Sequence, residues 1–69
     1  MNRYYHTFGQ GQANDGYYVL INATSPDLAR KKMFELYGAV WAFQYTEEAF
    51  KDSTHLDEYE LLEEHTVYG

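Results

Sequence analysis

Alternating apolar and polar positions predict two strands in the first third of the chain. In residues 2–8 the side chains of Tyr4, His6 and Phe8 recur at every second position, which is the period of a strand. Residues 17–23 are apolar on both faces, so this strand should lie centrally in a sheet or be covered on both sides. Residues 9–16 contain three glycines and end in Asn-Asp-Gly, which is loop chemistry. We therefore expect a hairpin with a long loop.

A helix is predicted between Ser25 and Gly38. Ser25 is a favourable N-cap, Pro26 suits the first helical position, and Asp27 places a carboxylate at the positive end of the helix dipole. Gly38 is a typical C-cap. The apolar face expected to pack on the sheet consists of Ala29, Met33, Leu36 and Tyr37.

The rest of the chain predicts a third strand and leaves the last element open. Residues 39–45 alternate as a strand does. The side chains predicted on one of its faces are Trp41, Phe43 and Tyr45. Residues 46–52 predict a short, N-capped helical turn, whereas residues 56–67 fit both a helix and a strand, of which we favour a fourth strand. The order predicts an α+β fold: a small antiparallel sheet (strand, strand, helix, strand, with a possible fourth strand) and one helix packed on a face.

Charge divides the chain into two parts. The 69 residues carry a net charge of −6 and, at this length, should form one domain with a small core. Up to residue 45 there are four cations and three acids, a net charge of +1, whereas residues 46–69 contain one lysine and eight acids, a net charge of −7. We therefore expect a single domain, residues 1–69, with a near-neutral core in residues 1–45 and an acidic C-terminal segment in residues 46–69.

The composition disfavours several classes of function. The absence of cysteine excludes disulfides, thiolate zinc sites and cysteine nucleophiles. The three histidines lack metal-ligand spacing, so we expect neither a metal nor a cofactor; His6 should be half-buried. The two serines form no catalytic arrangement, and we expect no enzyme. The net charge of −6 disfavours direct nucleic-acid binding, and neither a membrane-spanning apolar run nor a signal peptide is expected.

Aromatic residues make up 19% of the chain, more than a core of this size can enclose. Two interpretations are open: the large rings compensate for small size, or some of them form a binding surface or a homo-oligomer interface. A chain this short with neither a disulfide nor an expected metal favours the homo-oligomer.

One candidate site would take a small ligand. Arg30, Phe34 and Tyr37 follow one another at spacings of four and three, so they share one side of the helix and could hold a nucleobase and a phosphate. The alternative is a solvated Arg30 whose stem packs on a core ring. The glutamine amides of the loop could contact a base edge or a ribose, or the loop is simply a flexible turn. The candidate ligand-binding residues are Arg3, Gln10, Gln12, Arg30, Phe34, Tyr37 and Trp41.

The acidic segment is a second candidate site, for a protein partner. Its carboxylates could imitate a nucleic-acid backbone and occupy a basic groove. The alternative is a solvated face that keeps an aromatic-rich protein in solution. The candidate partner-binding residues are Glu47, Glu48, Asp57, Glu58, Glu63 and Glu64.

Several short strings occur in order along residues 4–50: TFGQGQ at 7–12, Tyr18-Val19, Ala29-Arg30, Met33-Phe34, Tyr37-Gly38 and WAFQY at 41–45. This pattern resembles a family of small proteins encoded by bacteriophages and prophages. The resemblance implies a phage accessory protein that acts in the bacterial cytoplasm. It implies no particular activity.

Two functional hypotheses follow from the residues and the resemblance together. In the first, the protein antagonises bacterial antiviral defence by binding and sequestering a small nucleotide signal in a homo-oligomer pocket. In the alternative, it is a protein-binding inhibitor, anti-CRISPR-like or directed at a nuclease, and its acidic segment mimics nucleic acid. A structural or virion role is left open, although no sequence feature speaks for it.

Overall fold

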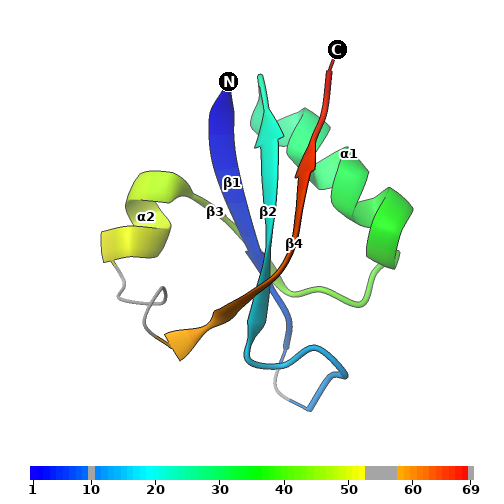
Figure 1. The fold of residues 1–69 in the computed structure, drawn as a ribbon. Coiled ribbons are helices and arrows are strands. Elements are labelled where there is room, and N and C mark those ends of the chain that lie inside the picture. The colour runs from blue at the N-terminus through cyan, green and yellow to red at the C-terminus, as the bar shows by residue number, and fades with distance from the viewer. Residues whose placement is uncertain (10, 53–57, 69) are drawn as a thin grey trace.

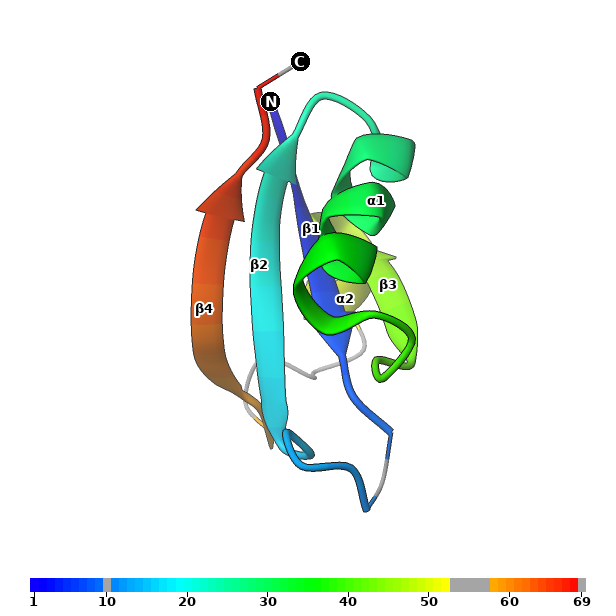
Figure 2. The ribbon, with the colours of Figure 1, turned by 90° about the vertical axis from the view of Figure 1, so that its right-hand side faces the viewer.

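The computed structural model describes residues 1–9, 11–52 and 58–68, which form one mixed sheet with a helix on each face (Figure 1, Figure 2). Its elements are β1 (Asn2–Thr7), β2 (Tyr17–Ala23), α1 (Pro26–Tyr37), β3 (Phe43–Thr46), α2 (Glu47–Asp52) and β4 (Glu60–Thr66). The strands lie in the order β3-β1-β2-β4. The α+β class predicted from the sequence is confirmed. None of the described helices is long and apolar enough to span a membrane.

The central strand β2 is covered on both faces. It forms a hairpin with β1, in which Asn2 lies opposite Ala23 and Thr7 opposite Tyr18. The buried residues on the α1 side are Tyr4, Phe8, Val19, Ile21, Ala23, Ala29 and Met33. Those on the α2 side are Tyr5, Leu20 and Phe50. The long-loop hairpin and the doubly covered strand are both as predicted.

Helix α1 has the ends that its sequence predicts. The Ser25 Oγ accepts a hydrogen bond from the backbone N–H of Leu28 at 3.3 Å. At the other end Gly38 has φ 62°, a left-handed conformation that favours glycine, and its N–H donates to the Phe34 carbonyl at 2.9 Å. The predicted apolar face is narrower than expected, because Leu36 is 37% exposed.

A second helix covers the other face, where the sequence predicted a short, N-capped helical turn at residues 46–52, and this prediction is confirmed. α2 begins with the hydroxyl of Thr46, which accepts from the N–H of Ala49 at 3.2 Å. Its Phe50 is fully buried and stacks on Tyr5 with the ring centroids 4.6 Å apart. One large ring therefore lets a six-residue helix close the second half of the core.

The fourth strand exists, but it runs parallel to β2, so the expectation of an antiparallel sheet is wrong for this pair. Between β3 and β4 the chain passes from one edge of the sheet to the other, a connection too long for a hairpin. The register between β2 and β4 shifts at Tyr18 and Val19 of β2, which lie opposite Leu61 and Glu63 of β4. This shift breaks the alternation of side chains along β4. Leu62 and Val67 pack on the α1-side core, an odd spacing that explains why the sequence fits two kinds of element.

The third strand starts at Phe43, four residues later than predicted, and it lies at the edge of the sheet. Trp41 precedes the strand and packs on the α1-side core, whereas Tyr45 packs on the α2-side core. The prediction that Trp41, Phe43 and Tyr45 share one face is therefore wrong for Trp41. Strict alternation holds only inside a regular ladder, and Trp41 lies outside it.

We expect Phe50→Ala to lower the free energy of unfolding by about 3–5 kcal/mol, because it empties the centre of the α2-side core. Phe43→Ala is the matched control, since its ring is 62% exposed, and it should cost less than about 1 kcal/mol. Urea denaturation followed by far-UV circular dichroism measures both. Equal losses in the two variants would mean that α2 does not dock on the sheet.

Candidate functional site

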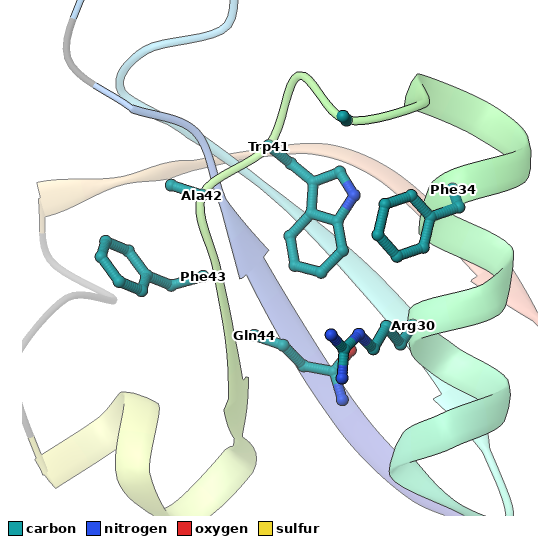
Figure 3. A pocket seen from close by; sticks show the side chains of 7 residues that line it. Arg30, Phe34, Trp41, Ala42, Phe43 and Gln44 are labelled. Atoms are coloured by element: carbon teal, nitrogen blue, oxygen red, sulfur yellow. The ribbon is translucent and has the colours of Figure 1, made fainter.

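A pocket of about 420 Å³ lies between α1 and the chain that leads into β3 (Figure 3). Its lining residues are Arg30, Phe34, Ala39, Trp41, Ala42, Phe43 and Gln44. The first two come from α1, and the others come from the segment after Gly38 and the start of β3. The volume lies within the range of small-molecule sites.

Two aromatic rings form the inner wall of the pocket. Phe34 and Trp41 meet at a centroid distance of 5.4 Å with their planes at 62°. Trp41 also meets the buried imidazole of His6 edge-on, at 5.5 Å and 88°. Phe34 keeps 48% of its surface exposed, whereas Trp41 is half-buried. The wall thus combines one half-buried ring with one exposed ring.

The indole nitrogen of Trp41 is a buried donor without a hydrogen-bond partner among the described residues. Figure 3 shows it on the edge of the indole that faces Phe34. A buried N–H without an acceptor is unfavourable. A ligand that carries an acceptor between the two rings would satisfy it.

A single cation lies at the mouth of the pocket. Figure 3 shows the Arg30 side chain extending from α1 across the opening toward Gln44. Arg30 is exposed, and no carboxylate of the described residues is within ion-pair distance of it. A guanidinium that is not neutralised and borders two aromatic rings is suited to a ligand that combines a planar ring with an anionic group.

Gln44 forms the floor of the pocket and is held by its neighbours. Its Nε2 donates to the carbonyl of Pro26 at 3.0 Å, which ties β3 to the first turn of α1. Its Oε1 lies 2.9 Å from Nε2 of His6. The other ring nitrogen of His6, Nδ1, lies 3.1 Å from the carbonyl of Val19. One imidazole therefore connects β1 with both of its neighbouring strands.

His6 is fully buried, so the expectation of a half-buried residue is wrong. Burial lowers the pKa of His6 below its usual value of 6.5, and the hydrogen bonds to Val19 and Gln44 oppose part of this effect. The neutral imidazole is therefore the dominant form at neutral pH.

The structure brings together three of the predicted ligand-binding residues and separates the others. Arg30, Phe34 and Trp41 line the pocket. Tyr37 turns into the core, where its ring meets Phe8 edge-on at 5.3 Å. The prediction that Tyr37 shares the side of Arg30 and Phe34 is therefore wrong, because Tyr37 lies where α1 meets the end of the hairpin.

Arg3 and the loop lie outside this pocket. Arg3 borders a different hollow, where its guanidinium is 3.7 Å from Oε2 of Glu47. In the loop, the amide oxygen of Gln12 accepts from the N–H of Gly9 at 2.8 Å, and Asp15 accepts from Gly11 at 3.3 Å. These loop N–H groups are thus used by the loop itself. Gln10 lies outside the described residues.

The acidic candidates are spread over two edges of the sheet. Glu47 and Glu48 begin α2, and Glu47 is also 3.8 Å from Lys51. Glu63 and Glu64 are successive residues of β4 and point to opposite faces, where Glu64 accepts from Asn22 at 3.0 Å. Glu58 is exposed, and Asp57 lies outside the described residues. The described carboxylates therefore do not form one row.

Sequence reasoning missed Gln44 and the role of His6. The signal was present: a glutamine inside an apolar strand pattern and a histidine inside an aromatic one are each a polar group that needs a buried partner. Their spacing of 38 residues gave no sign that the two groups meet. No group of three or more potential metal ligands occurs among the described residues.

The lowered pKa of His6 predicts acid sensitivity. Between the folded-state pKa and about 6.5 the unfolded chain binds more protons than the folded chain, so stability falls as the pH falls through this window. We expect the free energy of unfolding to decrease below about pH 6.5 in urea titrations. His6→Gln should flatten this limb, and His65→Gln should keep it. A limb that is unchanged in His6→Gln would assign it to other groups.

Comparison with known proteins returned no relative. No protein-family model matches the chain, and neither a curated protein nor a solved structure is detectably similar to it. The resemblance to phage-encoded proteins stays a prediction.

Proposed function

We propose that the protein is a non-enzymatic phage accessory protein that binds and sequesters a small nucleotide signal of bacterial antiviral defence, acting in the host cytoplasm. The observation that carries this proposal is the combination of an aromatic wall and an unpaired arginine in one pocket, among the described residues. A nucleotide offers both complements, a planar base and an anionic phosphate.

The wall supports base binding. Phe34 and Trp41 now contact each other at 62°, and rotation of the exposed Phe34 would let a base stack on the indole. The base would bring ring nitrogens or a carbonyl oxygen toward the unpartnered Trp41 N–H. Stacking on an aromatic side chain contributes about 1–3 kcal/mol per base.

The mouth supports phosphate binding. Arg30 has no carboxylate partner among the described residues, and a guanidinium donates two parallel hydrogen bonds to phosphate. No carboxylate is among the described residues that line the pocket, so none of them repels an anion. This local arrangement outweighs the net charge of −6, because a small nucleotide needs few cations.

The exposed surface around the pocket supports a homo-oligomer. Phe34 borders the pocket and is 48% exposed, and Val40, which is 56% exposed, lies between two lining residues in sequence. A second copy over this rim would enclose the ligand and bury these side chains. Enclosure without chemistry is what sequestration requires.

We expect 3′,5′-cyclic AMP, AMP or ADP-ribose to bind with measurable heat in isothermal titration. Arg30→Ala should weaken binding about 10- to 100-fold, because it removes a charge-assisted contact. Lys31→Ala is the matched control, since it removes the next cation of α1 outside the pocket lining, and it should change affinity less than about threefold.

Phe34→Ala and Leu36→Ala form a second pair, because both side chains are partly exposed on α1 and only Phe34 lines the pocket. The first should weaken binding and the second should not. If none of the nucleotides gives heat, or if Arg30→Ala and Lys31→Ala bind equally, the nucleotide proposal is wrong.

The second candidate is a protein-binding inhibitor whose acidic segment mimics nucleic acid. The observation that favours it is the acidic edge strand β4, where Glu60, Glu63 and Glu64 are all exposed. A basic groove could accept this edge.

For this candidate we expect inhibition of DNA cleavage by nucleases with basic grooves, weakened by salt. Glu63→Gln/Glu64→Gln should reduce the inhibition more than Glu47→Gln/Glu48→Gln does, because Glu47 is partly neutralised by Arg3 and Lys51. No inhibition at low salt, or equal effects of the two double variants, would contradict it.

A further inference from the structure

Three contacts in series link β2, β1, β3 and α1. They run from the Val19 carbonyl to His6, from His6 to Gln44, and from Gln44 to the Pro26 carbonyl, at 3.1, 2.9 and 3.0 Å. Both ends of the series are backbone carbonyls, which only accept hydrogen bonds. The hydrogen-bond donors must therefore be the two groups in the middle of the series, the imidazole of His6 and the amide of Gln44.

A neutral His6 cannot satisfy all three contacts. It carries one N–H. If Nδ1 donates to Val19, Nε2 is an acceptor that faces the acceptor Oε1 of Gln44; if Nε2 donates to Gln44, Nδ1 is an acceptor that faces the carbonyl of Val19. In the first case, turning the amide would correct the contact with Gln44 and set its oxygen against the Pro26 carbonyl. The imidazolium donates from both nitrogens and satisfies the whole series.

Burial acts in the opposite direction. His6 is fully buried, and burial disfavours its charged form, which is the largest influence on its pKa. The two states therefore differ in what they lack: the neutral state lacks one hydrogen bond, and the charged state lacks solvation.

The described residues around His6 are mostly uncharged, so an anion bound nearby would shift the balance between its neutral and charged forms. On its face of β1, β2 and β3 the neighbours are Tyr4, Phe8, Val19, Ile21 and Gln44, and α1 contributes Ala29 and Met33 to the same core. Of these only Tyr4 titrates. Among the described lining residues the cation is Arg30, and the causes of the shift of the His6 pKa are burial and the hydrogen bonds to Val19 and Gln44.

The same imidazole supports two residues that line the pocket. Nε2 of His6 contacts Gln44, which forms the pocket floor. The ring of His6 packs edge-on against Trp41, which forms part of the pocket wall. A change at His6 is therefore transmitted to floor and wall by direct contact.

We propose that His6 is a positioning residue for the pocket, and that the charge on its imidazole sets the arrangement of Gln44 and Trp41. In the charged state the amide of Gln44 is fixed between His6 and Pro26. In the neutral state three arrangements of the imidazole proton and the amide compete, with the one unfavourable contact at Val19, at Gln44 or at Pro26, and the pocket floor is less ordered.

A consequence for ligands rests on the proposed function. An anion at Arg30 offsets the positive charge near His6 and selects the ordered floor, so binding takes up a proton at His6. Affinity for an anionic nucleotide should then rise as the pH falls from the pKa of His6 in the complex to its lowered pKa in the free protein, by up to about tenfold per pH unit.

The first experiment needs no ligand. A pH titration followed by proton–nitrogen NMR tracks the His6 ring, the Gln44 side-chain amide and the indole N–H of Trp41, which is the one tryptophan of the chain. We expect all three signals to move with one midpoint. Gln44→Leu removes the acceptor at Nε2, so the midpoint of His6 and Trp41 should shift to lower pH. Signals of Gln44 and Trp41 that do not follow His6 would overturn the proposal.

The second experiment measures the affinity of 3′,5′-cyclic AMP against pH by isothermal titration. A phosphodiester is used because a phosphate monoester itself titrates near about pH 6. The pH dependence should be lost in His6→Gln and kept in His65→Gln, whose imidazole is on β4. If His6→Gln does not fold, proton uptake by the wild-type chain is measured in buffers of different ionisation enthalpy.

The two experiments distinguish failure of the His6 proposal from failure of the nucleotide proposal. Cyclic AMP binding with a flat pH dependence and no proton uptake would overturn the role of His6 in binding and leave the nucleotide proposal intact. Absence of binding by any nucleotide, with a shared NMR midpoint, would overturn the nucleotide proposal and leave the positioning role of His6 supported.

Discussion

The structure depends on one constraint, the need to cover both faces of β2. A strand that is apolar on both sides is stable only between two layers, and a chain of 69 residues has little material for them. α1 supplies one layer with Ala29 and Met33, and α2 supplies the other with a single phenylalanine. β3 is short, and the pocket forms where the irregular segment before it passes α1.

Local chemistry made the first half of the fold predictable. Ser25, Pro26 and Gly38 specify the ends of α1, and the double-faced pattern of residues 17–23 indicated a central strand; the structure agrees on both. The direction of β4 was not predictable, because direction depends on which edge the chain reaches after α2. The displacement of Trp41 escaped prediction for a similar reason, since alternation says nothing about where a ladder begins.

The candidate site was half predictable. Helical spacing predicts Arg30 and Phe34 as neighbours, and Trp41 is a further predicted ligand-binding residue that lines the pocket. The same spacing misplaced Tyr37, because a helix side says nothing about the loop that packs against it. His6 and Gln44 meet only through the pairing of β1 with β3, which is a contact between distant parts of the chain. Polar residues in apolar strands were the available signal, and strand pairing was the missing information.

The parallel pairing of β2 with β4 has a consequence for how the chain folds. The hydrogen bond between Asn22 and Thr66 joins residues 44 positions apart, and Leu62 and Val67 complete the core that begins at Tyr4. Loop-closure entropy opposes such distant contacts until late in folding, so acquisition of the native state should be slow for a chain of this size. During synthesis, the hairpin and α1 emerge with one side of β2 still lacking its neighbour. Until residues 60–66 have been synthesised, this edge of β2 can pair with strands of other chains. In this interval the chain itself does not protect the edge, and its protection depends on the cell that synthesises the protein.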